Sequence, residues 1–154
     1  MINVYRLPTS STQGLKYCLT QYNVVEGKVK GTTEYRKELF SQIKQYLNER
    51  KEINDIIIAG DFNQSIESNE IRKFYAEIGI EDVYSRINNI DLKQLDKAYI
   101  NRLKAIDSNA VSEGLMEFVE GLKLIHHNEI IFSDHRAYIV DINIEEYFRN
   151  QISS

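Results

Sequence analysis

A run of consecutive apolar residues, Ile56–Ala59, lies between Asp55 and Gly60 and is the feature that most constrains the fold. A continuous apolar run this short, bounded by turn-forming residues, is typical of a strand that is buried on both faces. A strand is buried on both faces only when further layers cover its sheet. The sequence therefore predicts a layered fold around a central strand.

Strand and helix patterns surround this run. Alternating apolar residues predict strands, and apolar residues at spacings of three and four predict helices. In the first half we expect a strand over 2–5 and three helices, from about 12 to 25, from Thr32 or Thr33 through Leu47, and from Ser68 or Asn69 to a stop at Gly79. A strand or turn over 80–84 and a loop over 85–97 follow. In the rest of the chain we expect strands over 99–106, 122–126 and 136–144, a helix over 109–120, and a short helix from 145. This mixture predicts sheets covered by helices.

Composition indicates one globular domain. The 154 residues are 42% hydrophobic and 27% charged, which is ordinary for a folded protein. With 19 basic and 23 acidic residues, the chain has no overall attraction for nucleic acid, so a polyanion would need a local basic patch or a metal ion. Cys18 has no cysteine partner, and neither a signal peptide nor a membrane-spanning stretch is recognisable. We therefore expect a soluble, intracellular protein.

Asp61 and Asn63 follow the buried run directly, in the tetrapeptide Gly60-Asp61-Phe62-Asn63. Two residues apart on a strand, their side chains point to the same side. A carboxylate there can accept a proton from water, and an amide can donate to a developing negative oxygen. The same residue types are also ordinary in turns. The tetrapeptide alone therefore leaves a catalytic role and a simple turn about equally open.

A second polar group, Ser133-Asp134-His135, precedes the last predicted strand. An aspartate beside a histidine can bring a metal-binding carboxylate and an imidazole into one pocket. By itself the pair carries little information, because any surface loop can contain it. Its value lies in its combination with the first group.

The two groups, in this order, resemble the motifs of the endonuclease/exonuclease/phosphatase (DNase I-like) superfamily. Residues 3–8, Asn-Val-Tyr-Arg-Leu-Pro, are similar to the family's strand that ends in a site tyrosine, and residues 105–108 are similar to its Ile-Asp segment. The resemblance extends from Asn3 to about Ile142. Within the superfamily the chain is most similar to retroelement-associated endonuclease domains.

The resemblance implies an α+β fold, as the C-terminal half of a four-layer α/β/β/α sandwich with a mainly antiparallel or mixed sheet and flanking helices. Residues 1–154 would then be a single, N-terminally truncated domain. In complete members an Asn and a Glu from the first half complete the metal site, and here no Glu precedes Tyr5. We therefore expect an incomplete metal site in this chain.

Catalytic roles also follow from the resemblance. Asp61 would orient or deprotonate the attacking water, and Asn63 would hold that water or a phosphate oxygen. His135 would stabilise charge on the phosphate oxygens, with Asp107 orienting its ring. Tyr5 would contact phosphate or assist catalysis.

Asp134 is the metal ligand that the resemblance implies, for Mg²⁺ or Mn²⁺. The reaction would be hydrolysis of a phosphodiester bond, with nucleic acid, in particular DNA, as the partner and with no membrane involved. The alternatives are a small-substrate phosphoesterase and an inactive remnant or binding module that lacks the first-half ligands. An uncovered apolar face would favour association with a missing N-terminal half, or self-association.

Overall fold

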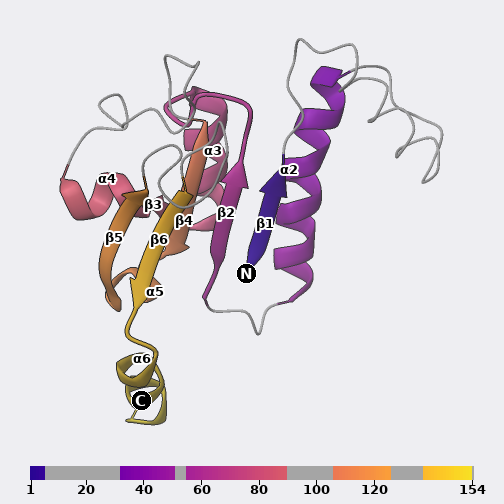
Figure 1. Cartoon of the computed structure of the whole chain (residues 1–154). Coiled ribbons are helices and arrows are strands. Elements are labelled where there is room, and N and C mark those ends of the chain that lie inside the picture. Colours follow the sequence, from indigo (N-terminus) through magenta and orange to yellow (C-terminus); the bar gives the residue numbers. More distant parts are fainter. Residues whose placement is uncertain (6–31, 51–54, 90–105, 126–136, 154) are drawn as a thin grey trace.

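Four strands form the main sheet of the protein, in the order β1 (Ile2–Tyr5), β2 (Ile57–Asp61), β4 (Asp107–Ser112) and β3 (Ile80–Asp82). β1 runs parallel to β2, whereas β4 is antiparallel to both β2 and β3. A second sheet is the antiparallel pair of β5 (Val119–Ile125) and β6 (Ala137–Ile142). The computed structural model, shown in Figure 1, describes residues 1–5, 32–50, 55–89, 106–125 and 137–153.

Two helices, α2 (Thr32–Glu49) and α3 (Asn69–Ile78), cover one face of the main sheet. Phe40 of α2 stacks on Phe74 of α3, with ring centroids 4.1 Å apart. Both rings belong to a buried cluster to which the sheet contributes Val4, Ile58 and Ala110. These helices are amphipathic as predicted, and their apolar sides form the larger hydrophobic core.

The ends of α3 are those that the sequence predicts. Ser68 precedes the helix in an extended conformation, and its side chain accepts a hydrogen bond from the Ile71 N–H. Gly79 follows the helix with a φ of 67°, the left-handed conformation in which glycine commonly ends helices. Local sequence signals therefore fix both ends of this helix.

The opposite face of the main sheet packs against the second sheet. A second apolar cluster lies between them, with Val83, Val111 and Leu115 buried and with Ile57, Leu122 and Val140 among the residues packed against these three. β2 therefore contacts the helix-side core through Ile58 and the inter-sheet core through Ile57. The burial on both faces that the apolar run predicts is confirmed, and the described residues form three layers in the order helix, sheet, sheet.

The described residues form three further helices. They are α4 (Val83–Asn88), α5 (Glu113–Met116) and α6 (Ile144–Ser153). α4 lies partly in the segment predicted to be a loop, and Asp82 caps it by accepting a hydrogen bond from the Ser85 N–H at 2.9 Å. Within the described part of the chain, no helix combines the length and the hydrophobicity needed to cross a membrane.

The predicted helix over 109–120 is wrong. Residues 109–112 belong to β4, which pairs with β2 on one side and with β3 on the other, and only Glu113–Met116 is helical. Ala110 and Val111 are buried on opposite faces of the sheet, in different clusters. Pairing with strands distant in sequence overrides the local helical pattern here. Of the strand predicted over 99–106 only Ile106 is described, directly before the start of β4 at Asp107. Residues 99–105 and the predicted helix over 12–25 lie outside the described residues.

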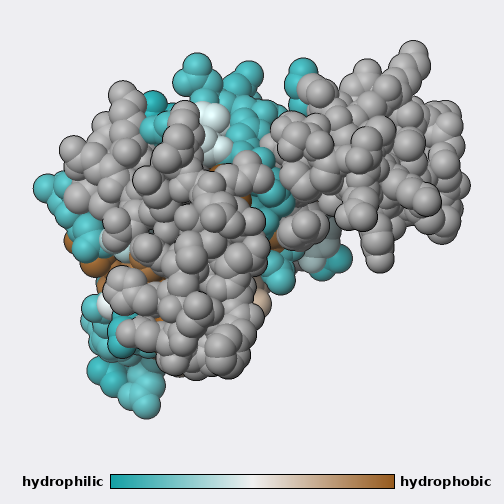
Figure 2. Space-filling model, turned by 45° about the horizontal axis from the view of Figure 1, so that its top comes forward, coloured by the Kyte–Doolittle hydropathy of each residue, from teal (hydrophilic) through white to brown (hydrophobic). Residues whose placement is uncertain are grey.

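Apolar side chains are exposed near the second sheet and on α6. Ile139 of β6 is 44% exposed, and Ile144 and Phe148 of α6 are 51% and 57% exposed. Figure 2 shows hydrophobic surface on the side of the molecule where β5 lies, next to a mainly hydrophilic surface. Of these residues only Ile139 belongs to the second sheet, and the expected uncovered apolar face stays a prediction.

Asp55 connects the start of β2 to the end of β4 and to α6. Its carboxylate accepts one hydrogen bond from the Ser112 hydroxyl, at 3.0 Å, and another from the Tyr147 hydroxyl, at 2.7 Å. The Tyr147 ring also packs edge-on against Phe118, at a centroid distance of 5.4 Å. The hydrogen bond to Asp55 raises the pKa of the Tyr147 hydroxyl above its ordinary value, because the phenol donates to a carboxylate. α6 is thus attached to the sheets by both packing and a charged hydrogen bond.

We predict that Tyr147→Phe lowers the free energy of unfolding by about 1 kcal/mol, because it removes the bond to Asp55 and keeps the ring contact. Tyr46→Phe is the matched control, since Tyr46 is 44% exposed and its ring lies under the Arg50 guanidinium, a contact that phenylalanine preserves. Urea denaturation followed by circular dichroism measures both. Equal effects of the two substitutions would show that the bond to Asp55 contributes nothing.

Candidate active site

The site begins with an unusually close contact between β1 and β2. At Gly60 the backbone has a φ of 145°, and a Cβ added there would lie 1.8 Å from the Val4 carbonyl oxygen. Only glycine combines this φ with the absence of a side chain. The glycine therefore allows β1 to pair with β2 up to their last residues, Tyr5 and Asp61.

The next three residues alternate between the core and the site. Phe62 is fully buried, and its ring packs near Phe40 and edge-on against Tyr75. Its N–H donates to the Ile106 carbonyl at 2.9 Å. Because Phe62 is held in the helix-side core, the residues before and after it, Asp61 and Asn63, are both directed away from that core.

Asn63 holds the Asp61 carboxylate through both of its oxygens. The backbone N–H of Asn63 donates to Oδ1 at 2.6 Å, and its Nδ2 donates to Oδ2 at 2.9 Å. Asn63 has a φ of 47°, a left-handed conformation that asparagine tolerates better than most residues. The turn and the catalytic interpretation of this tetrapeptide are therefore compatible, since the turn itself fixes the orientation of the carboxylate.

Three of the predicted site residues lie in one row across the main sheet. Tyr5 pairs with Asp61 in the parallel ladder, and Asp61 pairs with Asp107 in the antiparallel ladder. Paired positions in adjacent strands direct their side chains to the same face. The sheet therefore places the carboxylates of Asp61 and Asp107 side by side, and ends β1 next to them. The side chain of Tyr5 lies outside what the structure describes.

A hollow of about 310 Å³ lies over Asp61 and Asp107 of this row. Its polar lining includes Asp61 and Asp107, Asn3 and Asn109 of the next row on the same face, and Tyr138 of β6. Met1, Ile2, Ala59, Gly60 and Ser108 complete the lining. Asp107 is only 9% exposed, so it forms a buried part of the wall. The hollow is thus walled by both sheets and carries two carboxylates, two amides and a phenol.

Asn109 and Tyr138 are site residues that the sequence did not reveal. The sequence predicts a helix that begins at Asn109. In the structure Asn109 lies in β4, two residues after Asp107 and on the same face of the strand. Tyr138 comes from the other sheet, where it pairs with Leu124 and contacts the Tyr84 ring edge-on at 6.2 Å. Strand alternation could have found Asn109, but no local signal identifies Tyr138.

The two remaining predicted residues, Asp134 and His135, lie outside the described residues, so their expected roles stay predictions. Among the residues that the structure does describe, no group of three or more His, Cys, Asp or Glu side chains could hold a metal ion. The carboxylates of Asp61 and Asp107 are nevertheless oxygen donors of the kind that Mg²⁺ and Mn²⁺ prefer. A cation at this hollow would need at least one more ligand from elsewhere.

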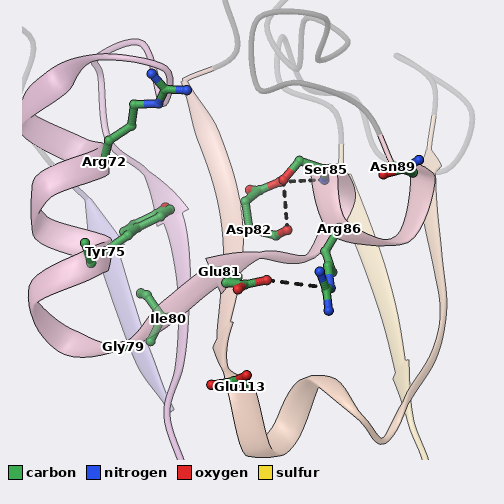
Figure 3. A pocket seen from close by; sticks show the side chains of 11 residues that line it. Arg72, Tyr75, Gly79, Ile80, Glu81, Asp82, Ser85, Arg86, Asn89 and Glu113 are labelled. Carbon is green, nitrogen blue, oxygen red and sulfur yellow. Dashed lines mark hydrogen bonds and ion pairs between the residues drawn. The ribbon is translucent and has the colours of Figure 1, made fainter.

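A larger hollow, of about 660 Å³, lies between α3 and α4 along the edge strand β3 (Figure 3). Its charged residues include Arg72, Arg86 and Glu81, and the last two form an exposed ion pair at 3.7 Å. No predicted site residue lines it. We therefore assign the candidate site to the smaller hollow, where strand ends bring the polar residues together.

We predict that Gly60→Ala destabilises the fold by roughly 3–5 kcal/mol, because steric overlap with Val4 adds to the strain of a positive φ. Gly79→Ala is the matched control: it also has a positive φ, but no atom lies within 4 Å of its added Cβ, so it should lose only about 1–2 kcal/mol. Chemical denaturation of both variants measures the difference. Equal losses would show that β1 does not approach β2 as closely as described.

Comparison with known proteins identifies the fold. No protein-family model matches the sequence, and no curated protein gives a significant match. Among solved structures, the chain is similar to a 3′ phosphatase, NExo, from Neisseria bound to product DNA hairpin, with a TM-score of 0.61 at 13% identity over 92% of this chain. It is also similar to an AP endonuclease from Archaeoglobus fulgidus, with a TM-score of 0.60 at 15% identity over 92% of this chain, and to the 3′-5′ exonuclease NExo from Neisseria meningitidis, with a TM-score of 0.62 at 13% identity over 91% of this chain.

These matches cover only 60%, 60% and 59% of the three structures, respectively. The similarity extends over nearly all of this chain. The predicted fold class is confirmed: the chain has a DNase I-like α+β fold and spans about three fifths of the length of the structures that it matches.

Proposed function

We propose that the chain contributes the water-activating side of a metal-dependent nuclease that hydrolyses phosphodiester bonds in DNA. The observation that carries the proposal is the row formed by Tyr5, Asp61 and Asp107 across three strands, in which Asp61 and Asp107 line the hollow. The structural neighbours support it, because those named above are DNA-processing enzymes by their descriptions.

Asp61 is the group that accepts the proton of the attacking water. Asn63 donates to both of its oxygens, so the carboxylate is held in one orientation. As the water oxygen forms a bond to phosphorus, its proton passes to Asp61 and the bond from phosphorus to the leaving oxygen breaks. The leaving oxygen takes up a proton from solvent or from a neighbouring acid.

Asp107 has a separate role in the proposal, which is to orient the His135 imidazole. A buried carboxylate is suited to fixing one tautomer of a histidine and stabilising its cationic form. The strand that follows His135 begins at Ala137, and Tyr138 of that strand lines the hollow beside Asp107. His135 is joined to this strand through a single residue, which favours its participation at the same site.

A divalent cation belongs to the proposal because of the charge of the site. Asp61 and Asp107 place two carboxylates in paired positions, and the sequence-predicted ligand Asp134 supplies carboxylate oxygen, the ligand type that Mg²⁺ prefers. When bound, the cation supplies positive charge that stabilises the phosphate oxygens during the reaction. The protein carries a net charge of −4, so its own side chains provide no general attraction for the DNA backbone.

We predict that Asp61→Ala lowers the rate of plasmid cleavage by about 100- to 10,000-fold, the range for loss of a general base. His135→Ala should cause a comparable loss, whereas Asp141→Ala, which removes an exposed carboxylate on β6 outside the hollow, should change the rate less than about twofold. The assay uses the 154-residue chain alone and joined to any in-frame coding segment that precedes it.

The same assay separates the alternatives. Plasmid that stays intact while a phosphomonoester or phospholipid is hydrolysed would identify a small-substrate phosphoesterase. If none of these substrates is cleaved, the chain is an inactive remnant or a binding module.

Metal dependence has its own test. We predict that EDTA abolishes plasmid cleavage and that adding excess Mg²⁺ or Mn²⁺ restores it, because the phosphate charge is then neutralised again. Cleavage that continues unchanged in EDTA, after dialysis against a chelating resin, would contradict the metal-dependent mechanism.

A further inference from the structure

A chain of buried hydrogen bonds lies behind β4, on the face opposite the hollow. The Tyr75 hydroxyl of α3 donates to the Ser108 hydroxyl at 2.9 Å, and Ser108 donates to Asp82 Oδ2 at 2.5 Å. All three residues are at most 5% exposed. In Figure 3, Tyr75 points from α3 toward the sheet, and Asp82 lies at the end of β3.

A second hydrogen bond holds the Asp82 carboxyl. Its other oxygen, Oδ1, accepts from the Ser85 N–H at the start of α4. Burial raises the pKa of the Asp82 carboxyl, and it also raises the pKa of the Tyr75 hydroxyl, since both charged forms lose solvation. Burying a carboxyl costs solvation free energy. Here the Asp82 carboxyl and its hydrogen-bond partners join α3, β3, β4 and α4 at one point.

Ser108 is the neighbour of Asp107 on β4, and their side chains take opposite faces of the strand. The Ser108 hydroxyl bonds Tyr75 of α3 and Asp82 of β3, while both Ser108 and its neighbour Asp107 border the hollow. Fixing the Ser108 side chain therefore fixes the rotation of β4 about its own axis where Asp107 is presented.

We propose that Ser108, held between Tyr75 and Asp82, is a positioning residue that sets the direction of the Asp107 carboxylate in the hollow. This inference rests on the proposed function, in which Asp107 orients His135. Ser108 acts through Asp107 and does not touch the substrate.

The strand itself offers a matched control. Ser112, further along β4, also donates its hydroxyl to a carboxylate, that of Asp55, at 3.0 Å. Ser108→Ala and Ser112→Ala therefore each remove one serine–aspartate hydrogen bond from the same strand. A purely structural role predicts similar effects on cleavage for both, whereas positioning predicts an effect for Ser108 alone.

In steady-state cleavage of a DNA oligonucleotide with Mg²⁺, Ser108→Ala should lower kcat about 10- to 100-fold, the range expected for a misplaced site group, with KM nearly unchanged. Ser112→Ala should leave kcat within about twofold. The double variant Ser108→Ala/Asp107→Asn should be no slower than Asp107→Asn alone, because both changes act through one group.

Several outcomes overturn the inference. They are equal kcat values for Ser108→Ala and wild type, equal losses in the two serine variants, and additive losses in the double variant. A wild-type protein that leaves the oligonucleotide intact overturns the proposed function instead. In that case the carboxyl ¹³C chemical shift of Asp107 at fixed pH still decides the placement: it should move in Ser108→Ala and not in Ser112→Ala, and an unmoved signal refutes the inference.

Discussion

The close contact of β1 with β2 at Gly60 is the constraint on which the site depends. The Val4 carbonyl oxygen occupies the space that any side chain at position 60 would need. Because the strands can approach this closely, β1 stays paired to its last residue, and Tyr5, Asp61 and Asp107 form one row. The site is therefore built from the backbone register of three strands whose residues are distant in sequence. A displacement of β1 would separate Tyr5 from the carboxylates without altering any site residue itself.

The site and the hydrophobic core lie on opposite faces of the same strands. On β2 and the turn after it, Ile58 and Phe62 face the helical layer and are fully buried, while Asp61 and Asn63 face away from it. On β4, Ser108 and Ala110 face the helical layer, while Asp107 and Asn109 line the hollow. Packing of the rings of α2 and α3 thus holds the polar groups in place from behind. This arrangement lets a small hollow keep a fixed geometry, because the rigid elements behind it determine the directions of its side chains.

The parts of the fold that could be predicted are those with local physical causes. The apolar run predicts β2, and the extended Ser68 and the left-handed Gly79 mark the ends of α3. Residues 109–112 could not be assigned in the same way, since an asparagine followed by small and apolar residues also suits the start of a helix. Their conformation is decided by hydrogen bonds to β2 and β3. Asp61 and Asp107 were identified through a family resemblance, but their pairing, and the presence of Tyr138, depend on register and sheet packing that no local pattern encodes.

The charge of the hollow explains why the proposed function includes a divalent cation even though the described residues offer few metal ligands. Asp61 and Asp107 lie in paired positions of adjacent strands, where two like charges repel each other and also repel a phosphate. A divalent cation reverses both effects, so in the proposed function the ion and the DNA backbone bind cooperatively. This coupling is reciprocal: the factor by which the ion strengthens DNA binding equals the factor by which DNA strengthens ion binding. Mg²⁺ is commonly held by one or two carboxylates together with substrate phosphates. In the proposed function a weak ion site in the free protein is therefore expected, and substrate phosphates would supply ligands that the described residues do not.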